Sequence, residues 1–340
     1  KEGVAGRITL NRPKALNALT WDMCLAIEAA LDEWRNDDVV TVIILEGAGE
    51  RAFCSGGDIA EMYASGQRGD LEYGRNFWRD EYRLNAKLYN YSKPIVSFLH
   101  GFTMGGGVGV GCHASHRIVC ENSQIAMPEC TIGLVPDIGG SLILAKAPGR
   151  VGEFMGVTGD RMDAADAIFV GFADAFVPQD KWDDLKTQLI ETGAPEIIKQ
   201  FAATPPESRI AGWQNDIDAS FAGETLADIY RGFPAEAGEA ITHARKLMGR
   251  NAPLAMSCAI EIIHRVRAGQ RIENALDQEF RYTFRCVEQG DFIEGIRAAI
   301  VDRDRNPVWL HKDWAAVSQA DVLRMTMPLG NDALIWEETE

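Results

Sequence analysis

The chain carries the stretch Phe53-Cys54-Ser55-Gly56-Gly57-Asp58-Ile59 and, about fifty residues later, a second glycine-rich stretch, Met104-Gly105-Gly106-Gly107-Val108-Gly109. Each follows an apolar run, 39–45 and 94–99, that is typical of a buried strand. Adjacent glycines at a strand end let the backbone approach a ligand where any Cβ would clash. Either loop alone is also typical of an ordinary tight turn, but two such loops can direct two backbone N–H groups at one developing oxyanion.

Around these loops, residues 1–182 alternate strand-like and helix-like runs. We predict strands at 6–10, 39–46, 94–100, 117–120, 124–126 and 173–177, and helices at 20–35, 141–146 and 152–158. This order implies a largely parallel sheet with right-handed crossovers. After Trp182 helical patterns dominate, with long candidates at 272–289 and 292–301. The sequence therefore predicts an α/β region over 1–182 and a helical C-terminal region over 183–340.

The helix at 20–35 has a recognisable beginning. Thr20 precedes the first apolar residues and is a good N-cap, because its hydroxyl can accept a hydrogen bond from a free backbone N–H of the first turn. We expect Leu25, Ala29 and Leu31 to face the core.

Composition excludes several classes of protein. The formal net charge of −16 argues against nonspecific binding of nucleic acid, which needs a basic surface. No apolar run reaches the roughly 18–20 residues that a membrane span requires, and no signal peptide is visible. The seven cysteines lack CxxC spacing, which favours reduced thiols over disulfides or a zinc site. We therefore expect partners other than nucleic acid or membrane, and a bacterial cytoplasm or, in a eukaryote, the mitochondrial matrix.

A third stretch, from Ala126 to Gly140, places two carboxylates among apolar and small residues. Glu129 and Asp137 each follow a proline, which restricts the local backbone and helps to aim the side chain. A carboxylate in apolar surroundings tends to have a raised pKa, as a general base requires. Two ordinary loop acids are the alternative interpretation of this pair.

Taken in order, these segments resemble the crotonase (enoyl-CoA hydratase/isomerase) superfamily. The matching residues run from about Gly6 to Val177 and include Asn11-Arg12-Pro13-Lys14-Ala15-Leu16-Asn17-Ala18-Leu19, the loop 53–59, His100-Gly101-Phe102-Thr103-Met104-Gly105-Gly106-Gly107 and Met127-Pro128-Glu129. The resemblance implies a ββα superhelix core followed by a helical C-terminal region.

Within this superfamily the sequence is most similar to the 3-hydroxyisobutyryl-CoA hydrolases. The hydratases have a glutamate two positions after the glycine triplet, where this chain has Gly109. The Pro-Glu-x-x-Ile-Gly-x-x-Pro-Asp-x-Gly-Gly run, with Asp137 in it, follows the hydrolase pattern, as do Arg79-Asp80-Glu81-Tyr82 and the tail segments 279–282, 290–298 and 302–309.

The resemblance implies a set of catalytic roles. The backbone N–H groups of Gly57 and Gly106 hold the thioester oxygen. Glu129 either attacks the carbonyl to form a mixed anhydride or activates a water that attacks it. Asp137 binds the 3-hydroxyl group and manages the proton near the leaving thiolate, and Glu81 supports the hydroxyl or the other carboxylates.

Coenzyme A is part of the substrate, so no separate cofactor or metal is expected. The resemblance assigns substrate contacts to Lys14, Ala15, Leu16, Ser55, Gly56, Asp58, Ile59 and Gly107. Lys14 and Arg51 are candidates for phosphate contacts, and solvated surface charge is the alternative for both.

Two other functions are consistent with the sequence. One is an enoyl-CoA hydratase or isomerase, and the other is a catalytically silent crotonase-fold protein that only binds partners. The chain is expected to be either a homotrimer, as in many relatives, or a monomer whose longer tail folds over its own core.

Overall fold

The structure is a computed structural model that describes residues 1–336. These residues form two compact units that interleave along the chain. Unit 1 contains residues 1–57, 83–126 and 161–209, and unit 2 contains residues 58–82, 127–160 and those from 210 onward. Every strand of the described residues lies in unit 1. The last strand ends at Phe176, and every regular element from Trp182 to residue 336 is a helix, as predicted.

Unit 1 is built on two parallel sheets. The larger sheet has five strands in the order β1-β2-β4-β6-β8, and the smaller has three in the order β3-β5-β7. All neighbouring strands pair in parallel, which confirms the predicted sheet type. Their bounds are β1 Ala5–Leu10, β2 Val42–Gly47, β3 Ala52–Cys54, β4 Ile95–Leu99, β5 Phe102–Met104, β6 His116–Val119, β7 Gln124–Ala126 and β8 Ala175–Phe176.

The two sheets share a repeating order of elements. In each of the pairs β2–β3, β4–β5 and β6–β7, the first strand joins the larger sheet and the second joins the smaller one. A helical segment follows each pair, which confirms the expected ββα arrangement. Strands β3 and β5 were not predicted, whereas β7, which has the same length of three residues, was; such short strands show no reliable hydrophobic period.

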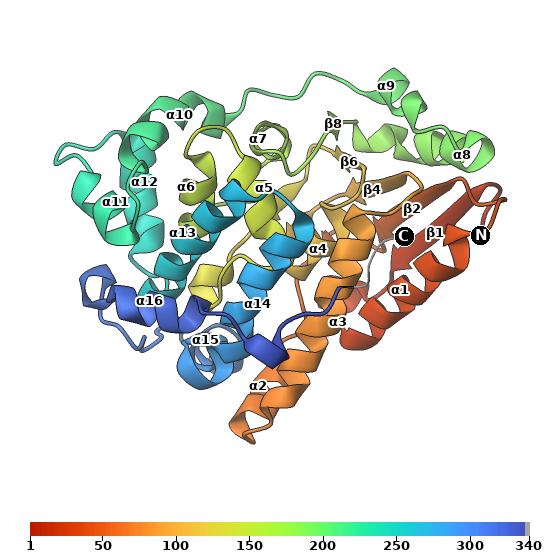
Figure 1. Cartoon of the computed structure of the whole chain (residues 1–340). Coiled ribbons are helices and arrows are strands. Elements are labelled where there is room, and N and C mark those ends of the chain that lie inside the picture. The colour runs from red at the N-terminus through yellow and green to blue at the C-terminus, as the bar shows by residue number, and fades with distance from the viewer. Residues whose placement is uncertain (337–340) are drawn as a thin grey trace. The chain divides into compact units, whose positions relative to one another are not determined.

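The helices of unit 1 cover the larger sheet. They are α1 Trp21–Arg35, α4 Gly106–Gly111, α7 Ala164–Val170, α8 Trp182–Thr192 and α9 Ile198–Phe201, and α3 (Leu71–Tyr89) begins in unit 2 and ends in unit 1. Helix α8 lies beside the larger sheet (Figure 1), and its Trp182, Leu185 and Leu189 share one buried cluster with Val42 and Ile44 of β2. Strands β2 and β4 are buried on both faces, which is why they read as continuous apolar runs.

Helix α1 begins as predicted but presents a different face to the core. The hydroxyl of Thr20 accepts a hydrogen bond from the N–H of Met23 at 3.2 Å. Leu31 is buried, whereas Leu25 and Ala29 are exposed, so that part of the prediction was wrong. The buried stripe consists instead of Cys24, Ile27, Glu28, Leu31 and Trp34, which recur at intervals of three or four residues.

Unit 2 is made of helices that pack around α13. Helices α5, α6 and α14 contact α13 or one another (Figure 1). The predicted helix at 272–289 is α14, and the one at 292–301 is α15 continued by a π turn over Arg297–Val301. The bounds are α2 Ala60–Gln67, α5 Gly140–Lys146, α6 Val151–Thr158, α10 Arg209–Ser220, α11 Leu226–Gly232, α12 Glu239–Met248, α13 Pro253–Ala268, α14 Ile272–Gln289, α15 Phe292–Ile296 and α16 Gln319–Thr326.

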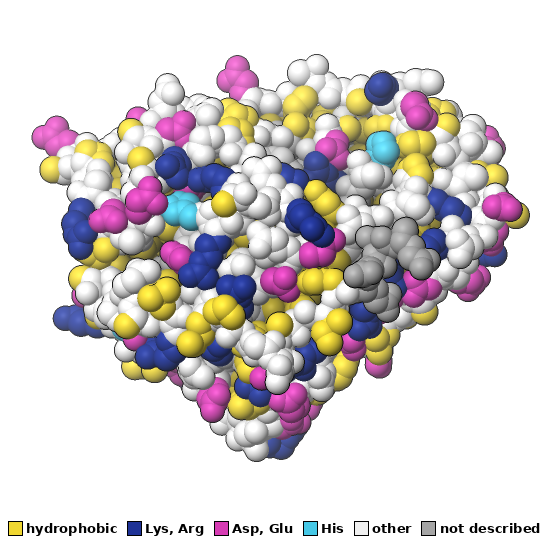
Figure 2. Space-filling model, in the orientation of Figure 1, with side chains coloured by type: hydrophobic (Ala, Val, Ile, Leu, Met, Phe, Trp, Pro, Cys, Tyr) yellow, Lys and Arg dark blue, Asp and Glu magenta, His cyan; other side chains and the backbone are white. Residues whose placement is uncertain are grey.

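The surface and the thiols match the composition. All seven cysteines are buried, and none of them forms a disulfide bond within residues 1–336. On the face seen in Figure 2, basic and acidic side chains are interspersed among apolar ones. Among residues 1–336, no helix combines the length and the apolar character needed to cross a bilayer.

Candidate active site

Two neighbouring strands of the smaller sheet lead to the two predicted oxyanion-binding glycines, all within unit 1. Because β3 and β5 are parallel and adjacent, their carboxyl ends lie at the same edge, where ligands bind in open α/β sheets. The chain reaches Gly57 three residues after β3 and Gly106 two residues after β5. Glu129 follows β7 in the sequence and belongs to unit 2.

The two glycine loops lie side by side in unit 1. Gly56 has φ = +117°, a conformation that favours glycine, and a Cβ built on it would lie 3.4 Å from the carbonyl oxygen of Met104 at the end of β5. The first loop is also tied to the N-terminal segment, since the N–H of Leu19 donates to Gly56 O at 2.8 Å and the N–H of Ser55 donates to Leu16 O at 3.0 Å.

The second loop turns directly into α4. Gly105 has φ = +47°, and a Cβ on Gly107 would lie only 2.4 Å from the carbonyl oxygen of Cys54, so this contact between backbones requires glycine. The N–H of Gly106 is in the first turn of α4, where no intrahelical acceptor exists. Within residues 1–336, the N–H groups of Gly57 and Gly106 have no hydrogen-bond partner, so both are available to a ligand.

The segment Lys14-Ala15-Leu16 is held beside the first glycine loop by Asn17. Lys14 and Ala15 are exposed on a short 3₁₀ turn, and Leu16 and Asn17 both have positive φ angles of 53° and 55°. The fully buried Asn17 amide accepts from the N–H of Arg12 and donates to the carbonyl oxygens of Ala48 and Ala52. Asn17 was not among the predicted site residues, although asparagine tolerates the left-handed region better than most residues do.

The remaining predicted residues of the first loop lie on either side of a unit boundary. Ser55 and Gly57 belong to unit 1, and Asp58 and Ile59 begin unit 2 just before α2. Arg51 is exposed, and its carbonyl oxygen accepts from the N–H of Phe102.

Unit 2 buries four carboxylic acids that interact electrostatically with one another, and we call them the acid cluster. Glu81 lies on α3, Glu129 begins the 3₁₀ turn Glu129–Ile132, Asp137 precedes α5, and Glu279 lies on α14. Their exposed fractions are 4%, 4%, 4% and 0%. Among the described residues, none of the four forms an ion pair.

Burial and mutual repulsion raise the pKa of these acids. Burial, with the charge of Asp137 adding to it, raises the pKa of Glu81 to about 8. Burial raises the pKa of Asp137 to about 7, although a hydrogen bond from Tyr82 opposes the shift. The pKa of Glu129 is well above its usual range because of burial and the charges of Asp137, Glu279 and Glu81. The cluster therefore holds protons near neutral pH, where isolated carboxyl groups would have lost them.

Asp137 is fixed by a hydrogen bond and by an unusual backbone. The hydroxyl of Tyr82 donates to Asp137 Oδ2 at 2.8 Å. Ile138 follows with φ = +53° and Gly139 with φ = +77°. A left-handed β-branched residue costs on the order of 1–3 kcal/mol and persists only where surrounding contacts enforce it, most often at functional sites.

Glu129 has one oxygen free for a ligand. Its Oε2 atom is buried and lacks a hydrogen-bond partner within residues 1–336. The turn that carries Glu129 is held from α14, because the hydroxyl of Tyr282 donates to Gly133 O at 2.9 Å. A buried, unpartnered carboxylate oxygen is costly unless a substrate or a water binds it.

Sequence reasoning missed two members of this arrangement. Tyr82 and Glu279 were quoted only as parts of similar segments, with no role assigned. Their neighbours in sequence gave no signal, because the groups they contact, Asp137 for Tyr82 and Gly139 for Glu279, lie 55 and 140 residues away.

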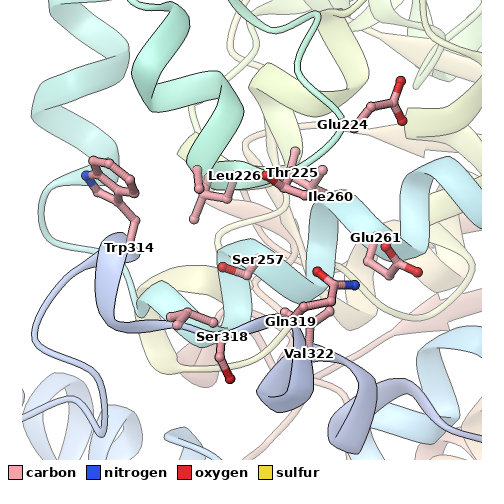
Figure 3. A pocket seen from close by; sticks show the side chains of 12 residues that line it. Glu224, Thr225, Leu226, Ser257, Ile260, Glu261, Trp314, Ser318, Gln319 and Val322 are labelled. Carbon is pink, nitrogen blue, oxygen red and sulfur yellow. The ribbon is translucent and has the colours of Figure 1, made fainter.

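A pocket elsewhere in unit 2 contains none of the predicted residues. Its volume is about 230 Å³, and Figure 3 shows side chains from α11, α13, α16 and the turn at Trp314 around it. Because it includes no member of the acid cluster, it is not the predicted site.

Comparison with known proteins shows which family the sequence matches. The enoyl-CoA hydratase/isomerase family matches residues 5–326. A Danio rerio protein named 3-hydroxyisobutyryl-CoA hydrolase, mitochondrial, is 34% identical over 330 residues, which cover 94% of this chain and 86% of that protein. The Homo sapiens protein of the same name is 31% identical over 345 residues, covering 98% and 89%.

Two solved structures are similar over the whole chain. One, described as an enoyl-CoA hydratase from Rhodobacter sphaeroides, is 49% identical with a TM-score of 0.94 and covers 99% of this chain and 98% of that one. The other, described as a carnitinyl-CoA dehydratase from Mycobacterium thermoresistibile, is 40% identical with a TM-score of 0.94, covering 100% and 98%.

Proposed function

Since the chain belongs to the enoyl-CoA hydratase/isomerase family, the crotonase family of acyl-CoA enzymes, we propose that it hydrolyses a short 3-hydroxyacyl-CoA thioester, with 3-hydroxyisobutyryl-CoA as the main substrate. The products are 3-hydroxyisobutyrate and coenzyme A. The relatives that carry this name span nearly the whole chain at 31–34% identity.

The observation that carries the proposal is the identity of the acids. Reversible hydration of an enoyl group is served by two carboxylates around one water, and in hydratases one of them follows the glycine triplet. Here that position is Gly109, which is buried in α4 and has no side chain to offer. The chain instead provides Asp137, buried with Glu129 and Glu81 in the acid cluster.

The proposed mechanism uses backbone donors and one acid. The N–H groups of Gly57 and Gly106 bind the thioester oxygen as it becomes negative, and one such donor contributes about 3–4 kcal/mol to the transition state. Glu129 either attacks the carbonyl carbon, giving a mixed anhydride that water then hydrolyses, or removes a proton from an attacking water. In both routes the C–S bond breaks, the thiolate leaves with its electron pair and takes up a proton, and Asp137 binds the 3-hydroxyl group and helps to manage that proton.

The remaining predicted residues are proposed to bind the rest of the substrate. Lys14, Ala15 and Leu16, held next to Ser55, are proposed to line the coenzyme A chain. Gly56 and Gly107 are proposed to let the backbone approach this chain closely. A side chain at Gly56 would be strained, and one at Gly107 would clash with the backbone of Cys54. Asp58, Ile59 and Glu81 complete the proposed set of substrate contacts.

A second candidate is an enoyl-CoA hydratase or isomerase. It is favoured by the solved structures at 49% and 40% identity, whose descriptions are a hydratase and a dehydratase. For this chain to act as a hydratase, Asp137 or Glu81 would have to take the place of the acid missing at Gly109.

One assay separates the candidates. Release of free thiol is measured with 3-hydroxyisobutyryl-CoA, 3-hydroxypropionyl-CoA and crotonyl-CoA, and loss of the enoyl absorbance is followed in parallel with crotonyl-CoA. We expect thiol release from the two 3-hydroxyacyl substrates. Loss of absorbance without thiol release would overturn the proposal in favour of hydration, and inactivity in both assays would favour a silent binding protein.

The proposed setting is a reducing compartment, with coenzyme A thioesters as the only ligands. The related hydrolases are named as mitochondrial, and the corresponding compartment in a bacterium is the cytoplasm. We propose either a homotrimer or a monomer, which light scattering coupled to gel filtration distinguishes.

A further inference from the structure

Glu279 holds the chain immediately after Asp137. Its side chain is fully buried on α14. Oε2 accepts from the N–H of Gly139 at 2.7 Å, and Oε1 accepts from the N–H of Ser141 at 3.0 Å and also from the Ser141 hydroxyl. One carboxylate thus binds three donors from residues 139–141.

Those donors lie on the strained part of the backbone. Ile138 and Gly139 have φ angles of +53° and +77°, and the N–H of Gly140 donates to Asp137 O within the turn. A β-branched residue keeps a left-handed conformation only when external contacts over-determine it. Glu279 supplies such contacts from a helix that lies far away in the sequence.

The surroundings of the turn also make Glu279 electrostatically relevant. The titratable groups around Asp137 are Glu129 on its turn, Glu81 and Tyr82 on α3, and Glu279 and Cys286 on α14. Apart from the tyrosine and the cysteine, all are acids, and none of the described residues pairs a cation with them. Burial raises the pKa of Glu279 itself to about 8, although hydrogen bonds from Ser141 and Gly139 oppose the shift, so its charge acts on its neighbours when it is ionised.

We propose that Glu279 is a positioning residue that enforces the left-handed turn at Ile138-Gly139 and thereby fixes the carboxylate of Asp137. Only the role of Asp137 in turnover rests on the proposed function. The anchoring of the turn is a property of the fold and can be tested by itself.

The first test measures amide hydrogen exchange in Glu279→Gln. The amide group keeps one acceptor and turns an NH₂ group toward the other backbone donors, so at least one of the N–H groups of Gly139 and Ser141 loses its partner. We expect exchange of these amides to become about tenfold faster or more, because hydrogen bonds to charged acceptors are the stronger ones. Glu153→Gln is the matched control, since Glu153 is equally buried in unit 2 but binds Arg150 just before α6 and Arg267 on α13. Equal exchange at 139 and 141 in wild type and Glu279→Gln would overturn the proposal.

The second test uses kinetics of the reaction that the wild type catalyses. We expect kcat of Glu279→Gln to fall about 10²-fold with a smaller change in KM, because a small displacement of a catalytic group is costly. Ser141→Ala removes one of the three donors and should give a smaller fall in the same direction. An unchanged kcat in Glu279→Gln would overturn the positioning role.

The pH profile separates positioning from loss of stability. The charge of Glu279 contributes, after burial and Asp137, to the raised pKa of Glu129, so Glu279→Gln should move the acidic limb of kcat/KM to lower pH. Tyr82→Phe removes the hydrogen bond that lowers the pKa of Asp137, so Asp137 is protonated more often and repels Glu129 less, and this variant should also move the limb to lower pH. A shift of the limb to higher pH in Glu279→Gln would contradict the proposal. If the wild type releases no thiol, the proposed function fails, but the exchange experiment still decides the role of Glu279.

Discussion

Unit 2 buries acids in two different ways. Glu153 on α6 is fully buried and is surrounded by Arg150, His264 and Arg267, with contacts of 2.7–3.1 Å. Burial alone would raise its pKa, but these hydrogen bonds and charges lower it to about 2. The acid cluster is buried to a similar degree, but its members face one another and their pKa values are raised.

This contrast separates an acid with cationic partners from acids that face other acids. The same unit provides three basic side chains to one glutamate and none to the four acids of the cluster, so burial by itself does not determine how a carboxylate behaves. A paired acid stays ionised and stabilises the fold. Crowded, unpaired acids cost stability at neutral pH, and such groups are retained where they bind substrate or move protons.

The largest expected effect is that of Glu129→Gln. We expect a loss of activity of about 10²–10⁴-fold or more, because the variant can neither attack the carbonyl nor accept a proton. The fold should persist, since Gln keeps the shape and removes an acid that repels its neighbours. Thiol release and thermal unfolding measure the two effects separately. Turnover at the wild-type rate would remove Glu129 from the mechanism.

Glu153→Gln should show the opposite behaviour. Breaking this buried cluster of charges should lower the free energy of unfolding by about 3–5 kcal/mol, because the arginines lose their counter-charge. The folded enzyme should keep its kcat. Chemical denaturation at pH 7 gives the first quantity, and steady-state kinetics at a temperature where the variant is folded give the second.

The pH dependence of that stability has a definite sign. The pKa of Glu153 is lowered from its usual value of 4.5 to about 2, which corresponds to about 3 kcal/mol. This stabilisation is present above about pH 4.5 and is lost as the pH falls toward 2. The difference in the free energy of unfolding between wild type and Glu153→Gln should therefore become smaller as the pH falls over that range. A constant difference would contradict the lowered pKa of Glu153.

The sequence predicted the fold class and singled out members of the acid cluster, but it did not single out Glu153. Apolar runs such as 39–46, alternating with helical patterns, predicted the parallel sheet, and the Pro-Glu and Pro-Asp steps identified Glu129 and Asp137 as unusual acids. A helical period alone did not fix the buried face of α1, because Leu25 and Ile27 define two different stripes and only tertiary packing selects the second.

Tertiary contacts explain what the sequence could not provide. Glu279 lies on an amphipathic helix like many surface glutamates, and only the approach of Gly139 and Ser141 makes it a buried anchor. Glu153 is similar, since His264 and Arg267 reach it from 111 and 114 residues away. The direction of a pKa shift depends on such partners, which are distant in the sequence. The residues that flank an acid in the sequence therefore predict whether it is buried better than they predict whether it is ionised.

The pH dependence of activity tests whether the acids of the acid cluster have raised pKa values. The proposed mechanism requires the base form of Glu129, so kcat/KM should rise with pH along an acidic limb. We expect that limb above pH 6, because the pKa values of Asp137, about 7, and of Glu129 are raised. The midpoint belongs to the cluster as a whole. Between pH 5 and pH 8 the change should be about 10²-fold, and a limb near 4.5 would mean that Glu129 titrates as an ordinary exposed glutamate.

The smallest expected effect is a gain in stability in Glu81→Gln. Burial, with the charge of Asp137, raises the pKa of Glu81 from 4.5 to about 8. For a raised pKa, the favourable contribution is complete below pH 4.5 and is lost as the pH rises through 8, so the wild type is penalised at alkaline pH. Glu81→Gln cannot ionise, and it should match the wild type at pH 4.5 and exceed it at pH 8 by about 1–2 kcal/mol, less than the full shift because Asp137 can hold a proton in its place.

Urea denaturation at the two pH values measures this difference, with Glu28→Gln as the control. Glu28 is a buried acid paired with Arg83 and Lys87, so its substitution should lower stability at pH 8. Opposite signs for the two variants would establish that the acid cluster is maintained at the expense of stability. A loss of stability in both would mean that Glu81 has a stabilising role of the same kind as Glu153, and the distinction between the two regions would not hold.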